Sequence, residues 1–202
     1  MEKGSIESPA QAQGQNAQGR TCILGLGNPL LGDDGVGWRV AEECARRLDG
    51  ARVHVDCHAG GGLSVMEKLV GYDRAILIDA MSLGRAPLGH VSVFRLEDLP
   101  DSCGGHLSSS HETNLPTALE LGRQLGAHLP SEIWIVAVES PYVYDLCESL
   151  TPAVSEAIPF AVEQALCSAR RPFAPGPAFG VRVVRGKGHA LGKIIPGCNN
   201  CD

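Results

Sequence analysis

Three features are missing from this sequence of 202 residues, and each absence excludes a class of protein. The body of the chain has no cluster of lysine and arginine, and its formal net charge is -6. Nucleic acids and anionic membranes attract basic proteins, so neither is expected as the main partner. No apolar run approaches the roughly 18–20 residues of a membrane span, and no secretory segment is visible. We therefore expect a cytoplasmic protein that does not insert into membranes.

Motifs for nucleotide binding and for triad hydrolysis are also missing. The glycine run 25–37 has Leu30 where a dinucleotide site of the form G-x-G-x-x-G needs its third glycine. The second predicted strand ends in Cys57-His58 and not in an acidic residue. There is no phosphate loop, no G-x-S-x-G elbow and no H-E-x-x-H helix. Hydrolysis by this protein would therefore use carboxylates, a metal ion or both.

Eight cysteines are many for this length, but their positions argue against a disulfide framework. Six are scattered along the body, several in apolar runs where buried thiols are typical: Cys22, Cys44, Cys57, Cys103, Cys147 and Cys167. We expect them to be reduced. Cys198 and Cys201 form a lone C-x-x-C, which supplies two ligands where a structural zinc needs four. An unselected tail, accessory metal binding and partner docking all stay open for this pair.

Composition divides the chain into one folded domain and two flanking segments. Residues 1–20 are polar and rich in glutamine, glycine and alanine, which predicts a disordered N-terminal tail. From residue 170 onward proline and glycine become frequent, which predicts a linker and C-terminal tail over 170–202. The folded domain is expected over 21–169, a length ample for one hydrophobic core.

Apolar runs that alternate with helical patterns predict an α/β fold. Strands are expected at 22–26, 53–57, 74–78, 91–95 and 133–138, and helices at 34–49, 63–70, 115–125 and 151–167. This order predicts a three-layer sandwich, in which a mostly parallel five-stranded sheet carries helices on both faces. Ligands of such sheets bind in a crevice outside the carboxyl ends of the strands.

Three residues stand just past predicted strands or in the loop that reaches the same edge. Asp34 closes G-L-G-N-P-L-L-G-D-D, Asp79 ends the run A-I-L-I-D, and His111 opens H-E-T-N after a Gly/Ser-rich loop. Taken singly, each has an ordinary explanation as a helix cap, a salt bridge or an incidental histidine. His58, at the end of the second strand, is a rival to His111. Together, two carboxylates and an imidazole are suitable ligands for a divalent metal.

The residues around Asp34 are expected to support it. Asn28 should hydrogen-bond the backbone of a tight strand-to-helix turn. Of the two adjacent acids, Asp33 is expected nearer the helix cap, with Asp34 pointing into the crevice. Glycines avoid a steric penalty in such a turn, and the relevant ones are Gly25, Gly27 and Gly35.

In combination these motifs resemble the hydrogenase maturation endopeptidases. The glycine run, L-I-D-A-M, S-S-H-E-T and an acidic E-S-P follow one another over about residues 21–168. The resemblance implies a twisted five-stranded sheet and a hydrolase, an aspartic-type endopeptidase. Such an enzyme removes a C-terminal extension from the precursor of a nickel-iron hydrogenase large subunit after nickel insertion.

The resemblance also assigns roles to residues. It implies that Asp34, Asp79 and His111 contact the nickel that the substrate carries, a site that other divalent ions such as zinc or cadmium can occupy in vitro. Asp34 and Asp79 would be the catalytic residues. The first acid is often glutamate in relatives, and Asp34 keeps the carboxylate with one methylene fewer.

The sequence leaves the mechanism open. A carboxylate can act as general base on the attacking water, or the metal can polarise the scissile amide. A non-catalytic nickel-binding chaperone or adaptor of the same fold is the alternative to an enzyme. In either case the expected partner is the precursor, and we expect a monomer.

Overall fold

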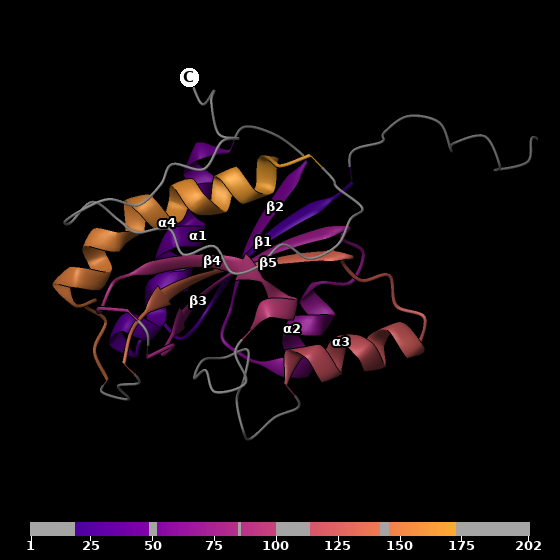
Figure 1. The fold of residues 1–202 in the computed structure, drawn as a ribbon, viewed down its shortest axis with the longest axis horizontal. Helices are drawn as coiled ribbons and strands as arrows, with labels where there is room; N and C mark the ends of the chain where they lie inside the picture. Colours follow the sequence, from indigo (N-terminus) through magenta and orange to yellow (C-terminus); the bar gives the residue numbers. More distant parts are fainter. Residues whose placement is uncertain (1–18, 49–51, 85, 100–113, 142–145, 173–202) are drawn as a thin grey trace, which may run out of the picture.

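The computed structural model describes residues 19–48, 52–84, 86–99, 114–141 and 146–172 (Figure 1). The strands are β1 (Thr21–Leu26), β2 (Val53–His58), β3 (Arg74–Met81), β4 (Val91–Arg95) and β5 (Glu132–Glu139). The α-helices are α1 (Val36–Arg47), α2 (Gly62–Lys68), α3 (Leu115–Gln124) and α4 (Pro152–Arg170). Two short 3-10 helices are η1 (Gly32–Gly35) and η2 (Leu96–Asp98).

The strands form one mixed sheet in the order β2-β1-β3-β5-β4. Four strands are parallel, and β4 runs antiparallel to β5 at the edge. The chain goes from β1 to β2 on one side and then to β3 on the other side of β1. The order therefore reverses between β1 and β3, which is the point where open α/β sheets bind their ligands. The predicted mostly parallel five-stranded sheet is confirmed.

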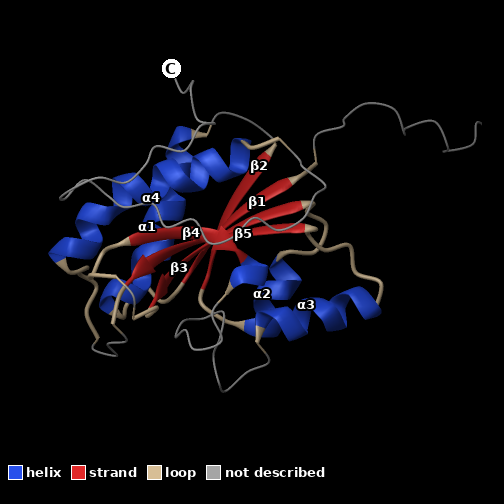
Figure 2. Ribbon diagram, viewed as in Figure 1, coloured by secondary structure: helices blue, strands red, loops and turns tan. Residues whose placement is uncertain are grey.

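Helices cover both faces of the sheet, as the sequence predicted (Figure 2). The α1 and α4 helices pack together on one face, and α2 and α3 pack together on the other. Each face has its own apolar core, with Ile23 and Val136 in the first and Leu24 and Ile135 in the second. Every residue of β3 is buried, as expected for a central strand covered on both faces.

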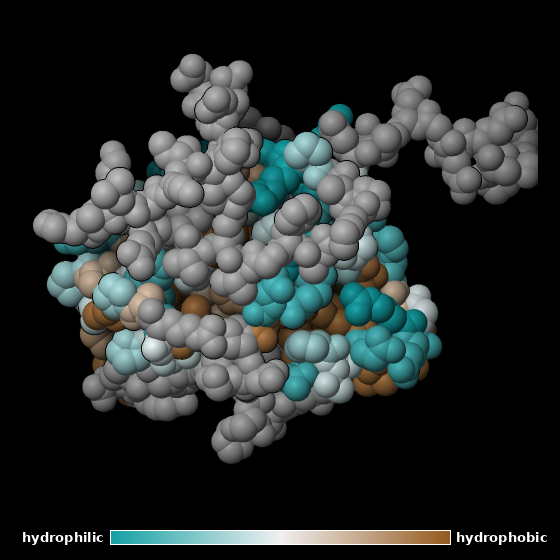
Figure 3. All heavy atoms as spheres, viewed as in Figure 1, coloured by the Kyte–Doolittle hydropathy of each residue, from teal (hydrophilic) through white to brown (hydrophobic). Residues whose placement is uncertain are grey.

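The view in Figure 3 shows hydrophobic residues on this face of the molecule in patches between hydrophilic ones. Within the described ranges, no helix combines the length and the apolarity needed to cross a membrane.

A glycine in the first turn of α1 brings this helix close to the sheet at the point where the strand order reverses. A Cβ at Gly37 would lie 2.5 Å from the carbonyl oxygen of Ile78 and closer still to that of Leu26. Only a glycine lets the helix backbone approach both strands this closely. The start of α1 is thereby held against the end of β1 and against β3 at Ile78.

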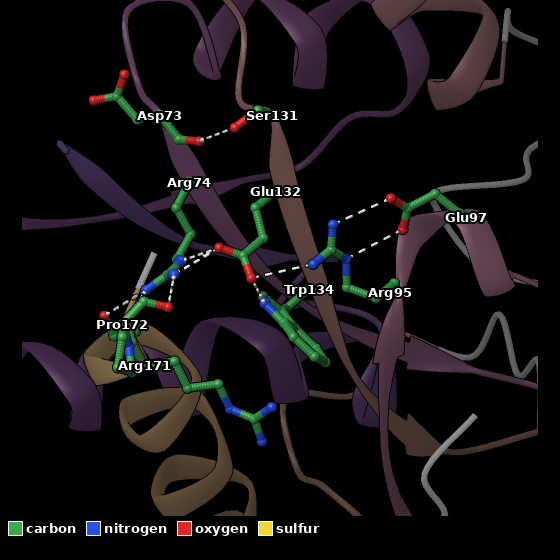
Figure 4. Close-up of polar contacts among 10 residues, drawn as sticks. Asp73, Arg74, Arg95, Glu97, Ser131, Glu132, Trp134, Arg171 and Pro172 are labelled. Carbon is green, nitrogen blue, oxygen red and sulfur yellow. Dashed lines mark hydrogen bonds and ion pairs between the residues drawn. The ribbon is translucent and has the colours of Figure 1, made fainter. Parts of the chain in front are cut away.

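The opposite, amino edge of the sheet carries a buried ionic network (Figure 4). Arg74 is 1% exposed and forms an ion pair of 2.6 Å with Glu132. Glu132 also accepts from Arg95 at 3.1 Å and from the Trp134 indole at 2.9 Å. The Arg74 guanidinium donates to three backbone carbonyls at the end of α4: Ala169, Arg171 and Pro172. The network fixes the last helix to the sheet far from the carboxyl edge.

Some element boundaries differ from the sequence predictions. The helix expected over 34–49 is divided, because η1 precedes an α-helix that begins at Val36. The third strand continues to Met81, so Asp79 lies within the strand and not after it. The last helix extends to Arg170, three residues beyond the prediction. The two predicted tails lie almost entirely outside the described residues and stay predictions, as does the Cys198–Cys201 pair.

Candidate active site

Asp34 lies in η1 and takes part in the turn that follows β1. Its Oδ2 accepts a hydrogen bond of 2.6 Å from the Asn28 backbone N–H. Asn28 in turn accepts from the Leu30 N–H at 3.0 Å through its side-chain oxygen. Gly27 has φ +115°, and a Cβ there would overlap the Asp34 carbonyl oxygen. The turn is therefore folded tightly around the Asp34 carboxylate.

Two more glycines keep this turn compact. A Cβ at Gly25 would lie 2.8 Å from the Cβ of Ala41 in α1 and would overlap the α1 backbone at Gly37. A Cβ at Gly35 would lie 2.8 Å from the Cα of Pro29. Both positions need a residue without a side chain because backbone passes directly against them.

Asp33 has a different role from the predicted one. The N-terminus of η1 has no side-chain cap hydrogen bond. The Asp33 carboxylate, 9% exposed, instead accepts from the Thr151 N–H at 2.6 Å, the Thr151 hydroxyl at 2.9 Å and the Ser140 hydroxyl at 3.3 Å. It connects the β1–α1 turn to the end of β5 and the start of α4. Asp33 was expected nearer the helix cap, and it lies in the first turn of η1, but its carboxylate binds partners more than 100 residues away.

Asp79 lies on β3, the neighbour of β1 in the sheet. Its relative exposure is 0%. It alternates with Leu77 and Met81 and so faces the α2–α3 side. The last pair between the two strands is Gly25 with Ile78, so Asp79 lies one step beyond that pair, next to the turn that holds Asp34. The fold therefore brings η1, which carries Asp34, against β3, the strand that carries Asp79.

The predicted histidine, His111, lies outside the described residues. In the part of the chain that is described, no group of three histidine, cysteine, aspartate or glutamate side chains is arranged to hold a metal ion. The ligand set of Asp34, Asp79 and His111 therefore stays a prediction. The rival, His58, has its Nε2 2.9 Å from the Ser64 hydroxyl, which itself donates to the Gly61 carbonyl. These bonds hold the turn between β2 and α2.

Glu139 is a residue at this edge to which the sequence assigned no role. It ends β5, is 7% exposed, and its Oε1 accepts from the backbone N–H groups of Leu83 at 3.0 Å and Gly84 at 2.9 Å. Its Oε2 is buried without a hydrogen-bond partner among the described residues. Glu139 thus fixes the chain where it leaves β3, just after Asp79. The sequence signals for it were its position at the end of an apolar strand and the acidic E-S-P motif that it begins.

Three described thiols, of which Cys22 and Cys44 are buried and Cys57 is partly buried, are unsuitable as nucleophiles. Burial raises the pKa of Cys22 and of Cys44 to about 12, and that of Cys57 to about 11. A thiol must lose its proton to react, so these three are almost entirely unreactive near neutral pH. The carboxylates of Asp34 and Asp79 are therefore better candidates for the chemistry than these three thiols.

Comparison with known proteins identifies relatives of this chain. A family model described as hydrogenase maturation protease matches residues 38–168. The chain is 32% identical over 162 residues to the hydrogenase expression/formation protein HoxM of Azotobacter vinelandii, a match that covers 74% of this chain and 75% of that protein. It is 29% identical over 153 residues to the hydrogenase 2 maturation protease of Escherichia coli, covering 75% and 91% of the two chains.

A solved structure shows the same fold. The hydrogenase maturating endopeptidase HybD from E. coli superposes with a TM-score of 0.61 at 28% identity. The match covers 75% of this chain and 92% of that one. The three-layer architecture predicted from the sequence is therefore also that of a solved relative.

Proposed function

This chain belongs to the hydrogenase maturation protease family, and from that premise we propose that it removes the C-terminal extension of a nickel-iron hydrogenase large-subunit precursor after nickel insertion. Membership makes it a hydrolase of the protease class. The observation that carries the finer proposal is the position of Asp34 and Asp79. Asp34 lies in η1, which follows β1, and Asp79 lies in the last part of β3, the neighbour of β1 at the point where the sheet order reverses. Open α/β sheets usually bind their ligands at this point, which supports the proposal.

The burial of Asp79 supports a chemical role. It stands in a row of apolar side chains that includes Leu77 and Met81. An apolar residue would pack there without the desolvation that a carboxylate suffers. Acids that are buried at such a cost in desolvation are often found at functional sites.

In this proposal the nickel belongs to the substrate. Asp34, Asp79 and His111 would contact it, since oxygen and nitrogen ligands suit borderline divalent ions. Zinc or cadmium would enter the same site in vitro for the same reason. Three protein ligands leave coordination positions for the groups of the precursor that already hold the nickel. The enzyme would thereby act only on a precursor that carries its metal.

For the cleavage step we propose general-base catalysis by a carboxylate. Asp34 is the better placed of the two acids, because it is half-buried and accessible to water, whereas Asp79 is fully buried. The carboxylate accepts a proton from water as the oxygen attacks the scissile carbonyl carbon. The carbon–nitrogen bond then breaks, and the proton passes to the leaving amine.

The test uses purified precursor with and without nickel, incubated with the wild-type protein and with Asp34→Asn and Asp79→Asn variants. Mass spectrometry should show a shortened product only for the nickel-loaded precursor with the wild-type protein. Equal processing of the nickel-free precursor would refute recognition of the metal. If the wild type binds the precursor without shortening it, the protein is the nickel-binding adaptor.

We also propose that the protein acts in the cytoplasm as a monomer. Four described cysteines carry thiols and no disulfide, which fits a reducing compartment: Cys22, Cys44, Cys57 and Cys147. Light scattering coupled to size exclusion should give a mass near the 21.3 kDa of one chain, and twice that value would refute the monomer.

A further inference from the structure

His58 ends β2 and lies beside the candidate active site, on the opposite side of β1 from Asp79. The strand register shows this position, because Cys57, Gly25 and Ile78 pair in one row across β2, β1 and β3. His58 and Asp79 each follow this row by one residue. Neighbouring strands are about 4.8 Å apart, so the backbones of these two residues are separated by roughly 10 Å. They therefore flank the end of β1.

The side chains of His58 and Asp79 lie on the same face of the sheet. Side chains alternate between the two faces along a strand. In β2, Val55 and Cys57 pack against the core on the α1–α4 face, so His58 lies on the α2–α3 face. Asp79 lies on that face too, as does Leu26 at the end of the strand between them. The end of β1 thus has an imidazole on one side and a carboxylate on the other.

The Asp34 carboxylate is held at the same end of β1. Its Oδ2 accepts from the Asn28 N–H at 2.6 Å and lies 3.5 Å from the position that a Cβ of Gly27 would occupy. Gly27 directly follows Leu26, whose pairing partner is His58. Both His58 and Asp34 are partly exposed to solvent. The imidazole and the proposed general base therefore stand around one strand end that water reaches.

The hydrogen bonds of Ser64 determine which nitrogen of His58 carries a proton. The Ser64 hydroxyl has one proton, which it donates to the Gly61 carbonyl at 2.9 Å. In the 2.9 Å contact between the same oxygen and His58 Nε2, the donor is therefore Nε2. A neutral imidazole carries a proton on only one of its nitrogens. Nδ1 is then the nitrogen with the lone pair, which accepts hydrogen bonds.

We propose that His58 is a further catalytic residue, whose Nδ1 holds the attacking water together with the Asp34 carboxylate. Asp34 takes one proton of the water as the oxygen attacks the scissile carbonyl carbon. The other hydrogen is donated to Nδ1 and stays on the oxygen. Two acceptors fix the orientation of the water and so direct its lone pair at the carbonyl. This inference rests on the proposed function, because it adds a residue to the cleavage step.

A pair of substitutions separates the functions of the two ring nitrogens. His58→Gln places an amide at the distance of Nε2 from the backbone, where its N–H can donate to Ser64. His58→Asn places a carbonyl oxygen at the distance of Nδ1, where it can accept from water. Each amide keeps one function of the imidazole and removes the other. A residue that only holds the turn tolerates glutamine better than asparagine, and a residue that holds the water shows the reverse order in kcat.

The assay is the cleavage of nickel-loaded precursor by each variant, with urea denaturation to check that the variants are folded. With His58→Gln, kcat should fall about a hundredfold and KM should stay within about twofold, because the water loses one of its acceptors. With His58→Asn, kcat should stay within about fivefold of the wild type. His54→Ala is the matched control, since His54 lies on the same strand and face at the amino end. It should change neither constant.

Three results would overturn the role of His58 and leave the proposed function in place. The first is cleavage by His58→Gln at the wild-type kcat, and the second is a larger loss of kcat in His58→Asn than in His58→Gln. The third is a proton on Nδ1 instead of Nε2 in the wild-type protein, which long-range proton–nitrogen NMR of the imidazole detects. If the wild type does not shorten nickel-loaded precursor, the proposed function is refuted and the role of His58 with it.

Discussion

Replacing the adjacent acids Asp33 and Asp34 should change different properties of the protein. Replacing Asp33 should affect stability, and replacing Asp34 should affect cleavage. Asp33→Ala should lower the stability of the fold, because its carboxylate joins the β1–α1 turn to Thr151 and Ser140. Asp34→Asn should leave the stability nearly unchanged and abolish cleavage. Asparagine keeps a side-chain carbonyl oxygen that can accept from the Asn28 N–H, but it cannot act as a base.

The expected loss for Asp33→Ala follows from its hydrogen bonds. The two bonds from Thr151 measure 2.6 and 2.9 Å and end on a buried carboxylate. A hydrogen bond to a charged group contributes roughly 1.5–3 kcal/mol. Thr151 is exposed, so water replaces part of this loss, and we expect a decrease of about 2–4 kcal/mol in the free energy of unfolding.

Urea denaturation followed by circular dichroism measures this difference. With a slope of about 2 kcal/mol per molar urea, the midpoint should fall by roughly 1–2 M for Asp33→Ala. For Asp34→Asn it should change by less than about 0.5 M. Cleavage of nickel-loaded precursor is then assayed at a urea concentration below the midpoints of both variants, where the wild type and the two variants are folded.

Two outcomes would refute this reasoning. An unchanged midpoint for Asp33→Ala would show that its hydrogen bonds to Thr151 and Ser140 contribute nothing to the fold. Residual cleavage by Asp34→Asn close to the wild-type rate would exclude Asp34 as the base. A large loss of stability in Asp34→Asn would make its inactivity uninformative, and the assignment of a purely chemical role to Asp34 would then be wrong.

Three further predictions concern the scaffold. Gly37→Ala should destabilise the protein by about 3 kcal/mol in urea titrations, because the new methyl group would overlap the Leu26 carbonyl; an unchanged midpoint would contradict the close approach. Arg74→Met should cost about 3–5 kcal/mol by leaving Glu132 buried without its main partner, and calorimetry should show a melting temperature lower by about 10 °C. Cys22, whose pKa burial raises to about 12, should resist alkylation at pH 8 and react increasingly as the pH rises toward that value. Peptide mass mapping checks this, and rapid modification of the native protein at pH 8 would contradict it.

Much of the fold follows from patterns within a few residues. The buried run that became β3 and the helical spacing that became α1 are local features, so the sequence alone predicted both elements and the sheet class. The glycine-rich turn around Asn28 could be predicted for the same reason, because the conformation of a turn depends on adjacent residues. The sequence predicted the ends of helices and strands less well than their presence. Asp79 was expected after its strand, and pairing with β5 extends that strand to Met81.

Contacts between distant segments were decided only by the tertiary structure. Asp33 looked like a helix cap, but the sheet order brings Thr151 to its carboxylate from 118 residues away. The hydrogen bonds of Glu139 to the turn after β3 arise in the same way, because β3 and β5 are neighbours in the sheet and not in the chain.

The sequence by itself singled out the residues that we propose to carry the chemistry, since Asp34 and Asp79 stand out from their local patterns. The tertiary structure decided which of the neighbouring acids supports the fold, and it joined the loop after β1 to the segment around Cys147 by backbone hydrogen bonds. The physical reason is the distance along the chain over which each kind of interaction acts. Periodicity and turn preferences act over a few residues, whereas hydrogen bonds between loops depend on the order in which the strands assemble.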